Sequence, residues 1–198
     1  MTTAQLVAIA AALGWASGLR LYAVVFLTGA AGQLGWVDLP QGLHVLQHPL
    51  MLSASGLMFA LEFFADKIPG IDTVWDLVHT VVRIPAGAAL AAGVFGADEA
   101  TWATAAALLG GTLAAASHVT KATTRAAVNT SPEPFSNIAL SLAGDGAVPF
   151  VLWLSWVSPV ALFAVLGVVL VAMAVTVWVL SRFLKALLRR FRPAAAGG

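Results

Sequence analysis

A run of 36 residues without a charged side chain, 146–181, most limits what this chain can fold into. A helix needs about 20 apolar residues to cross a bilayer, so the run is long enough for more than one crossing. Ser158-Pro159 divides it, because a proline disfavours a helix that continues through it and through the residue before it. We therefore expect one helix over about 135–157 and another over about 159–184.

The composition agrees with a membrane location for the whole chain. Of the 198 residues, 60% are hydrophobic and 10% are charged, whereas soluble domains carry about 25% charged residues. Such a chain cannot cover a water-facing surface, which excludes a soluble enzyme, a disordered protein and a nucleic-acid binder. We expect an all-α integral membrane protein whose partner is the lipid bilayer, with no nucleic-acid partner.

The N-terminal part holds two further uncharged runs. Residues 1–19 and 21–37 are separated only by Arg20. This pattern predicts either one long broken helix or a short helix followed by a re-entrant one. A proline-flanked loop then leads into a helix expected over about 50–64.

Two more helices are expected in the middle of the chain. After a polar stretch, Pro85 suits the first position of a helix, and this helix would run through 97. Asp98-Glu99 predicts a turn. The uncharged run 100–120 predicts the next helix, which continues toward Asn129.

Together the runs predict about six membrane segments, some of them broken or re-entrant, in one polytopic domain over 1–184. The halves 1–97 and 100–184 each hold about three segments. Three segments per half allow an inverted repeat of three plus three, an arrangement found in alternating-access carriers. The segments are compatible with a homo-oligomer.

The segment 185–198 is expected to be a basic cytoplasmic tail. Five of the ten basic residues fall within the last seventeen positions, and cytoplasmic ends of membrane proteins carry an excess of Lys and Arg. These five are Arg182, Lys185, Arg189, Arg190 and Arg192. We expect a multi-pass protein of the bacterial inner membrane with a cytoplasmic C-terminus.

Ionisable side chains inside these segments are the candidates for function, because each is costly in lipid and needs a partner, a cavity or an interface. One set has helical spacing of 4, 3 and 4, and so shares one helix face: Asp72, Asp76, His79 and Arg83. An acidic pair, Glu62 and Asp66, precedes it. Either these groups bind a cation or relay protons, or the helix lies at the interface with its charges among the headgroups.

The best candidate metal ligands are Asp72, Asp76 and His79. Hard carboxylate oxygens and an imidazole on one helix face suit a divalent cation. No other cofactor is identified. The chain has no cysteine, so thiolate metal sites and cysteine nucleophiles are excluded.

A basic set in the second half has spacing of 3, 4 and 4: His118, Lys121, Arg125 and Asn129. It can pair with the acidic residues of the first half as a purely structural salt-bridge network. Alternatively, its cations form a site for an anion or a phosphate together with Arg20 and Arg83, because guanidinium groups suit oxyanions.

A fourth set begins at a predicted helix start. Ser131 suits an N-cap and Glu133 suits the first helical turn. Capping does not explain why the polar residues continue at a spacing of 4: Glu133, Asn137, Ser141 and Asp145. A polar seam that faces a cavity or partner helices explains all four.

Near the N-terminus, Arg20 is an isolated charge that follows small residues in an apolar run. This pattern predicts a helix interruption that places a cation at membrane depth. The alternative is that the first helix stops at Gly14 and the arginine snorkels to an interface.

Several stretches resemble the hallmark sequences of an uncharacterised bacterial family of multispanning membrane proteins, catalogued as a domain of unknown function. They are residues 62–72 (EFFADKIPGID), Trp75-Asp76, His79-Thr80, 129–137 (NTSPEPFSN) and Ser17-Gly18-Leu19-Arg20. The resemblance covers most of residues 5–157. It implies the multispanning fold and brings no activity with it.

The leading functional hypothesis is a small helical transporter or channel for an ion or small polar solute, in one form coupled to protons or cations. Its cavity would lie at the junction of the two halves. Glu133 and Asp145 would face Glu62, Asp66 and Asp76 across it, with Arg20, Arg83 and Arg125 as counter-ions or anion ligands.

Two alternatives belong to other classes. A membrane-embedded enzyme that hydrolyses or transfers a lipid phosphate would hold the phosphate with Arg20, Lys121 and Arg125, and would use His79 or His118 as acid or base. The sequence has no recognised nucleophile motif, so an enzyme is less favoured. The second alternative is a structural membrane partner with a salt-bridged core.

Overall fold

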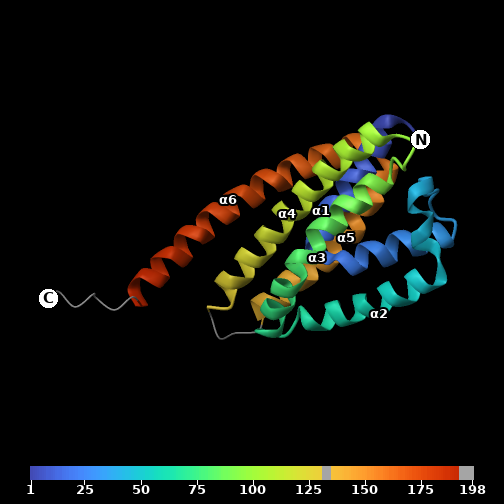
Figure 1. Cartoon of the computed structure of the whole chain (residues 1–198). Helices are drawn as coiled ribbons and strands as arrows, with labels where there is room; N and C mark the ends of the chain where they lie inside the picture. The colour runs from blue at the N-terminus through green and yellow to red at the C-terminus, as the bar shows by residue number, and fades with distance from the viewer. Residues whose placement is uncertain (131–134, 192–198) are drawn as a thin grey trace.

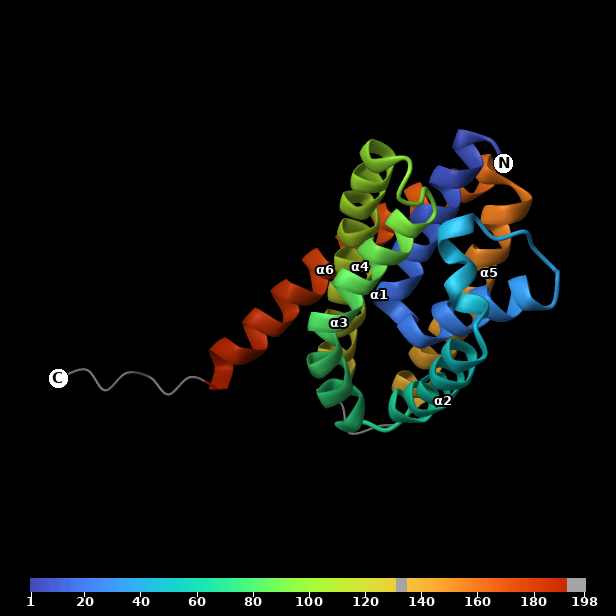
Figure 2. The ribbon, with the colours of Figure 1, turned by 45° about the vertical axis from the view of Figure 1, so that its right-hand side comes forward.

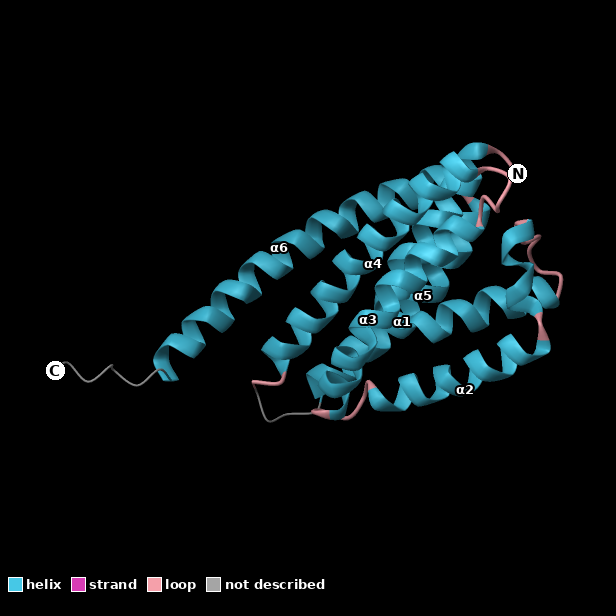
Figure 3. Ribbon diagram, in the orientation of Figure 1, coloured by secondary structure: helices cyan, strands magenta, loops and turns pink. Residues whose placement is uncertain are grey.

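The computed structural model describes residues 1–130 and 135–191, and every regular element in those ranges is a helix. The order is α1 (Thr3–Gln33), the 3-10 helix η1 (Gln41–Gln47), α2 (Pro49–Ala65), α3 (Ile71–Gly93), α4 (Ala100–Val128), α5 (Phe135–Val157) and α6 (Pro159–Phe191). Figure 3 shows these helices as nearly the whole of the described chain. The expected all-α fold class is confirmed.

Three of the described helices are long and apolar enough to cross a membrane: Thr3–Gln33, Phe135–Val157 and Pro159–Arg189. A fourth crossing results if η1 and α2, which meet at 69°, form one broken span. Most apolar side chains of α6 lie on the outside of the bundle, a surface that suits lipid tails rather than water. The chain is a helical membrane protein.

α1 lies at the centre of the bundle (Figure 1), where it packs against α2, α3, α4 and α5. Every residue from Ala8 to Gly18 is buried. A helix that is apolar on all sides is expected in such a position. The alanines and glycines of α1 also allow its neighbours to approach closely.

α1 is interrupted at Arg20, whose backbone angles of φ −146° and ψ 76° are not helical. The part after the interruption turns away from the first part (Figures 1 and 2). The two ends of α1 lie toward the same end of the bundle. At the start of α1, Gln5 donates to the carbonyl oxygen of Trp156 at the end of α5. Beyond the other end of α1, Gly42 of η1 packs against Gly93 at the end of α3. α1 is thus a broken helix whose two ends both lie toward the same end of the bundle.

The expectation for Pro85 is wrong. A new helix was expected to start there and to reach 97, but Pro85 lies inside α3, which runs from Ile71 to Gly93 without a break. Proline removes only one backbone hydrogen bond from a helix. α3 packs along α4 over much of its length, and neighbouring helices make proline tolerable inside membrane helices.

Other boundaries agree closely with the sequence. α2 occupies Pro49–Ala65, and Ser158 separates α5 from α6. α6 continues to Phe191, through the start of the basic tail that was expected to begin at 185. Figure 1 shows its C-terminal half leaning away from the other helices.

The first part of α1 and α4 are in close contact and run in the same direction. A Cβ at Gly14 would collide with the backbone of Gly110, and a Cβ at Gly18 would collide with the carbonyl of Ala114. The residue numbers of the two pairs rise together, which only parallel helices allow. An inverted repeat would relate these two helices, the first of each half, in opposite directions. The expected three-plus-three repeat therefore does not describe this pair.

Candidate functional site

Ten charged side chains meet inside the bundle, and we call them the ionic cluster. They are the basic residues Arg20, Lys67, Arg83, Lys121 and Arg125 and the acidic residues Glu62, Asp66, Asp72, Asp76 and Asp145. Every basic residue that precedes Arg182 belongs to it. Its five cations and five anions balance, which offsets part of the cost of removing them from water.

Arg20 is placed in the cluster by the interruption of α1. Its side chain is 2% exposed, and its Nη2 lies 2.8 Å from Asp145 Oδ1. A broken helix leaves carbonyl groups without their usual partners, and Lys121 Nζ donates to the carbonyl oxygen of Leu19 at 3.0 Å. The expectation of a buried cation at a helix interruption is confirmed, and the alternative of a snorkelling side chain is wrong.

Asp66 follows the last residue of α2 and is surrounded by three cations. Lys121 Nζ lies 2.7 Å from its Oδ2, Arg125 Nη1 lies 3.0 Å from its Oδ1, and Arg20 Nη1 pairs with Oδ2. The positive charges of Lys121, Arg20 and Arg125 offset the cost of burying this carboxylate and stabilise its charged form at the centre of the cluster.

Arg83 joins the acidic groups of α2 and α3. Its Nη2 lies 2.8 Å from Glu62 Oε1, and its Nη1 lies 2.6 Å from Asp76 Oδ1. Arg83 and Glu62 are fully buried. The predicted face of α3 therefore points inward, so α3 is not an interfacial helix with its charges among the headgroups.

Asp145 joins α5 to the cluster. Its Oδ2 lies 2.9 Å from Lys67 Nζ. One turn earlier on the same face, the Ser141 hydroxyl accepts hydrogen bonds from Arg20 Nη2 at 2.8 Å and from Lys67 Nζ at 3.3 Å. The predicted polar seam of α5 therefore faces partner helices.

Asp72 and Asn129 connect the start of α3 to the end of α4. Asn129 Nδ2 donates to Asp72 Oδ2 at 3.2 Å, and Arg125 Nη1 lies 3.6 Å from the same oxygen. The Asp72 carboxylate also accepts hydrogen bonds from the backbone of Gly70 and Thr73. Asp72 thus fixes the turn that precedes α3.

Both predicted histidines are bonded through both ring nitrogens. His79 Nδ1 lies 2.8 Å from the carbonyl oxygen of Trp75, and Nε2 lies 3.1 Å from the Tyr22 hydroxyl. His118 Nε2 lies 2.7 Å from the Thr80 hydroxyl. Arginine only donates, so His118 Nδ1 accepts from Arg83 Nη1 at 3.3 Å and the ring hydrogen is on Nε2.

The predicted metal site is not formed. Among residues 1–130 and 135–191, no three His, Asp or Glu side chains are arranged to hold a metal ion. Asp76 faces Arg83 and His79 faces Tyr22. Helical spacing placed the trio on one face, but that face meets cations instead of an open coordination site.

Some buried polar atoms of this region have no hydrogen-bond partner. They include Glu62 Oε2, Arg83 Nε and both amide atoms of Asn137, whose side chain is fully buried. Unpaired buried polar atoms are rare, and each calls for a physical reason such as water, an ion or a ligand.

A pocket of about 290 Å³ adjoins the cluster between α1, α4, α5 and α6. Arg20, Asp66, Lys121 and Arg125 line its charged side. The rest of the lining is small or apolar, with Leu140 from α5 among it. Three basic side chains and one acidic side chain thus face this space.

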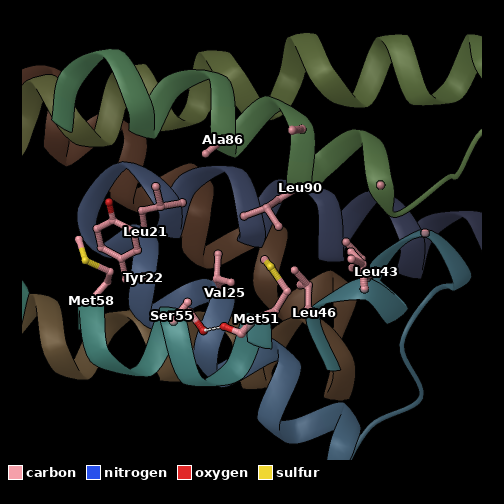
Figure 4. Close-up of a pocket in the computed structure, with 15 residues that line it drawn as sticks. Leu21, Tyr22, Val25, Leu43, Leu46, Met51, Ser55, Met58, Ala86 and Leu90 are labelled. Carbon is pink, nitrogen blue, oxygen red and sulfur yellow. Dashed lines mark hydrogen bonds between the residues drawn. The ribbon is translucent and has the colours of Figure 1, made fainter. Parts of the chain in front are cut away.

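A second pocket, of about 420 Å³, lies between α1, η1, α2 and α3. Figure 4 shows Tyr22 of α1 and Met58 of α2 at one end of it and Leu43 of η1 at the other. Its lining holds no charged side chain, and the hydroxyl of Ser55 donates to a backbone carbonyl. Of these two pockets, only the first therefore has charged side chains in its lining.

The cluster unites most of the predicted site residues. Asn137 is buried without a partner, and His79 lies beside the cluster against Tyr22. Ser131 and Glu133 lie outside the described residues. Sequence reasoning did not select Lys67, Tyr22 or Thr80 as site residues, and the only available signal was that Lys67 and Thr80 follow Asp66 and His79 directly.

The chain matches one family model, which is described as a domain of unknown function (DUF4126), over residues 7–180. The match includes most of α6, which the resemblance seen in the sequence did not. No match was found among the curated proteins or the solved structures.

Proposed function

The chain belongs to the family described as a domain of unknown function (DUF4126), and we propose that it is a small helical membrane transporter or channel for an ion or small polar solute. One observation carries the proposal: four charged side chains of a buried ionic cluster line a pocket between helices of a membrane protein. Ionisable groups in such a position are costly and typically mark solute pathways.

The unpaired polar atoms support a pathway over a purely structural cluster. A structural network gains most when every member is satisfied, yet Glu62 Oε2, Arg83 Nε and the Asn137 amide have no partner. These side chains are fully buried and do not line the pocket, so bound water or an entering solute would be needed to satisfy them.

The broken helix supports the same function. Transporters commonly place their binding sites where membrane helices are interrupted, because freed backbone groups and inward-facing charges meet there. Here the interruption places Arg20 in the pocket lining. It also leaves the carbonyl oxygen of Leu19 to accept a hydrogen bond from Lys121 Nζ.

We further propose that α2 to α6 each cross the inner membrane of a bacterium and that α1 is a re-entrant segment. This arrangement has six membrane segments. It puts the N-terminus outside and the basic C-terminal end inside, in agreement with the excess of Lys and Arg after position 181.

The lipid-phosphate enzyme is less well supported. Its acid or base would be His79 or His118, but both rings are bonded through both nitrogens. Neither ring lines the pocket that Arg20, Lys121 and Arg125 line.

Uptake into liposomes tests the proposal. The purified protein is reconstituted, and the uptake of protons, monovalent cations and small anions is compared with that of protein-free liposomes. We expect uptake of one solute class, and a strong reduction in Asn137→Leu, which keeps the branching of the side chain but removes the unpaired amide. Folded protein that moves none of these solutes would contradict the proposal.

A further inference from the structure

We propose that Arg20, Lys121 and Arg125 form a binding site for a small carboxylate anion, and that Asp66 occupies this site in the present conformation. The inference rests on the proposed function and names its class of solute. It follows from the way the three cations surround one carboxylate that belongs to the chain itself.

The contacts of Asp66 are those of a bound anion. Lys121 and Arg125 approach its two oxygens at 2.7 and 3.0 Å, and Arg20 pairs with the first of these oxygens. A free carboxylate in the same place would make the same three charge-assisted hydrogen bonds. The site is therefore already shaped for this chemical group.

The charge balance sets the charge of the solute. The cluster holds five cations and five anions. If Asp66 withdraws, five cations face four carboxylates, and one negative charge restores the balance. A singly charged anion fits this requirement, whereas a cation would add to the uncompensated charge.

The pocket beside Asp66 provides space for the solute. All three cations, and Asp66 itself, are among the residues that line the space of about 290 Å³, so this space adjoins the proposed site. Ser141 also lines this space. Its hydroxyl oxygen accepts from Arg20 and Lys67, which leaves its own hydrogen free to be donated to an anion.

Binding of an outside anion requires Asp66 to leave the three cations. Asp66 follows α2 directly, and a turn through Gly70, whose φ of 89° is one that glycine favours, joins it to α3. α2 packs mainly on α1 and makes few contacts with α3. A shift of α2 would therefore draw Asp66 out of the three cations, while Arg20, Lys121 and Arg125 stay on α1 and α4.

Chemical rescue tests the site. Asp66→Ala is purified in detergent, and its thermal unfolding is followed in sodium formate and in sodium chloride of equal ionic strength. We expect formate to raise the Tm saturably, by about 4 °C or more, because a ligand that binds only the native state stabilises it. Asp98→Ala, which removes an exposed carboxylate at the α3–α4 turn, should show no difference between the two salts.

A double variant tests whether the three cations form the site. Formate should lose its effect in Asp66→Ala combined with Arg125→Gln. An equal Tm in formate and chloride for Asp66→Ala would overturn the inference. If Asp66→Ala unfolds in chloride, it is purified in formate throughout. A variant that is folded in formate and unfolded in chloride supports the site. A variant that is unfolded in both salts counts against the site.

Liposome uptake separates this inference from the proposed function. Uptake of any solute without rescue by formate would leave the transporter standing and refute the carboxylate site. Rescue without uptake of acetate or any other tested solute would support the site and refute transport.

Discussion

Arg125 holds Asp66 at two points: its Nη1 lies 3.0 Å from the carboxylate Oδ1, and its Nη2 donates to the main-chain carbonyl oxygen at 3.2 Å. A side chain of α4 thus fixes both the charge and the backbone at the end of α2. A planar guanidinium suits this pair of contacts, because its two terminal nitrogens donate to different oxygens.

Arg125→Ala should therefore lower the free energy of unfolding strongly, by about 3–5 kcal/mol, because it removes one of the three cations around Asp66 and leaves one negative charge of the buried cluster uncompensated. Arg125→Lys keeps the charge but loses one of the two contacts, so its loss should be smaller. Chemical or thermal unfolding in detergent measures both. Lys185→Ala, at an exposed position of α6, is the control. If Arg125→Ala is as stable as the wild-type protein, Arg125 does not hold Asp66 in place.

The contact between α1 and α4 gives a second prediction. A Cβ at Gly14 would collide with Gly110, whereas a Cβ at Gly167 in α6 meets nothing within 4 Å. Gly14→Ala should destabilise the protein by about 1–3 kcal/mol through overpacking. Gly167→Ala should be neutral or stabilising by up to about 1 kcal/mol, because alanine favours a helix over glycine. Equal effects of the two substitutions would refute the close approach.

Glu62 and Arg83 should be energetically coupled, because both are fully buried and lie 2.8 Å apart. A double-mutant cycle with Glu62→Gln, Arg83→Met and the double variant measures the coupling. We expect the double variant to be more stable than the sum of the single losses predicts, by about 0.5–3 kcal/mol. Strict additivity would show that the pair does not act as a unit.

The sequence predicted which residues share a face but not which groups they meet. The spacing of Asp72, Asp76 and Arg83 correctly indicated one inward face of α3. No spacing relates Arg20, Asp66 and Arg125, which lie on three separate elements, so only the packing of α1, α2 and α4 shows that they meet. The metal prediction failed for the same reason, since Asp76 also meets Lys121 of α4, whose Nζ lies 3.0 Å from its Oδ1.

Some helix boundaries could also be predicted from the sequence, whereas others depend on packing. Proline marked the start of α2 and of α6 correctly, because nothing in the sequence opposes a break there. Pro85 gave the same local signal inside α3. Its context differs because α4 packs along α3, and that packing compensates for the missing hydrogen bond in a way that local sequence does not reveal.

Asn137 and Ser141 lie one turn apart on α5 and should respond oppositely to loss of their polar groups. The buried amide of Asn137 has no partner, and an unsatisfied buried group costs about 1–3 kcal/mol. Asn137→Leu should therefore keep or raise stability. Ser141→Ala should lower it by about 1–2 kcal/mol, because Arg20 and Lys67 both donate to this hydroxyl. A large loss in Asn137→Leu would mean that the amide is bonded after all.

The course of α1 can be tested by labelling, because the chain has no cysteine of its own. Three exposed positions serve as reporters: Thr3 at the start of α1, Asp38 after α1, and Lys185 in α6. If α1 is re-entrant, Thr3→Cys and Asp38→Cys lie on the same side of the membrane. A membrane-impermeant maleimide should label both in intact cells, and should label Lys185→Cys only after permeabilisation. If Thr3→Cys instead behaves like Lys185→Cys while Asp38→Cys is labelled in intact cells, α1 crosses the membrane completely and the proposed topology is wrong.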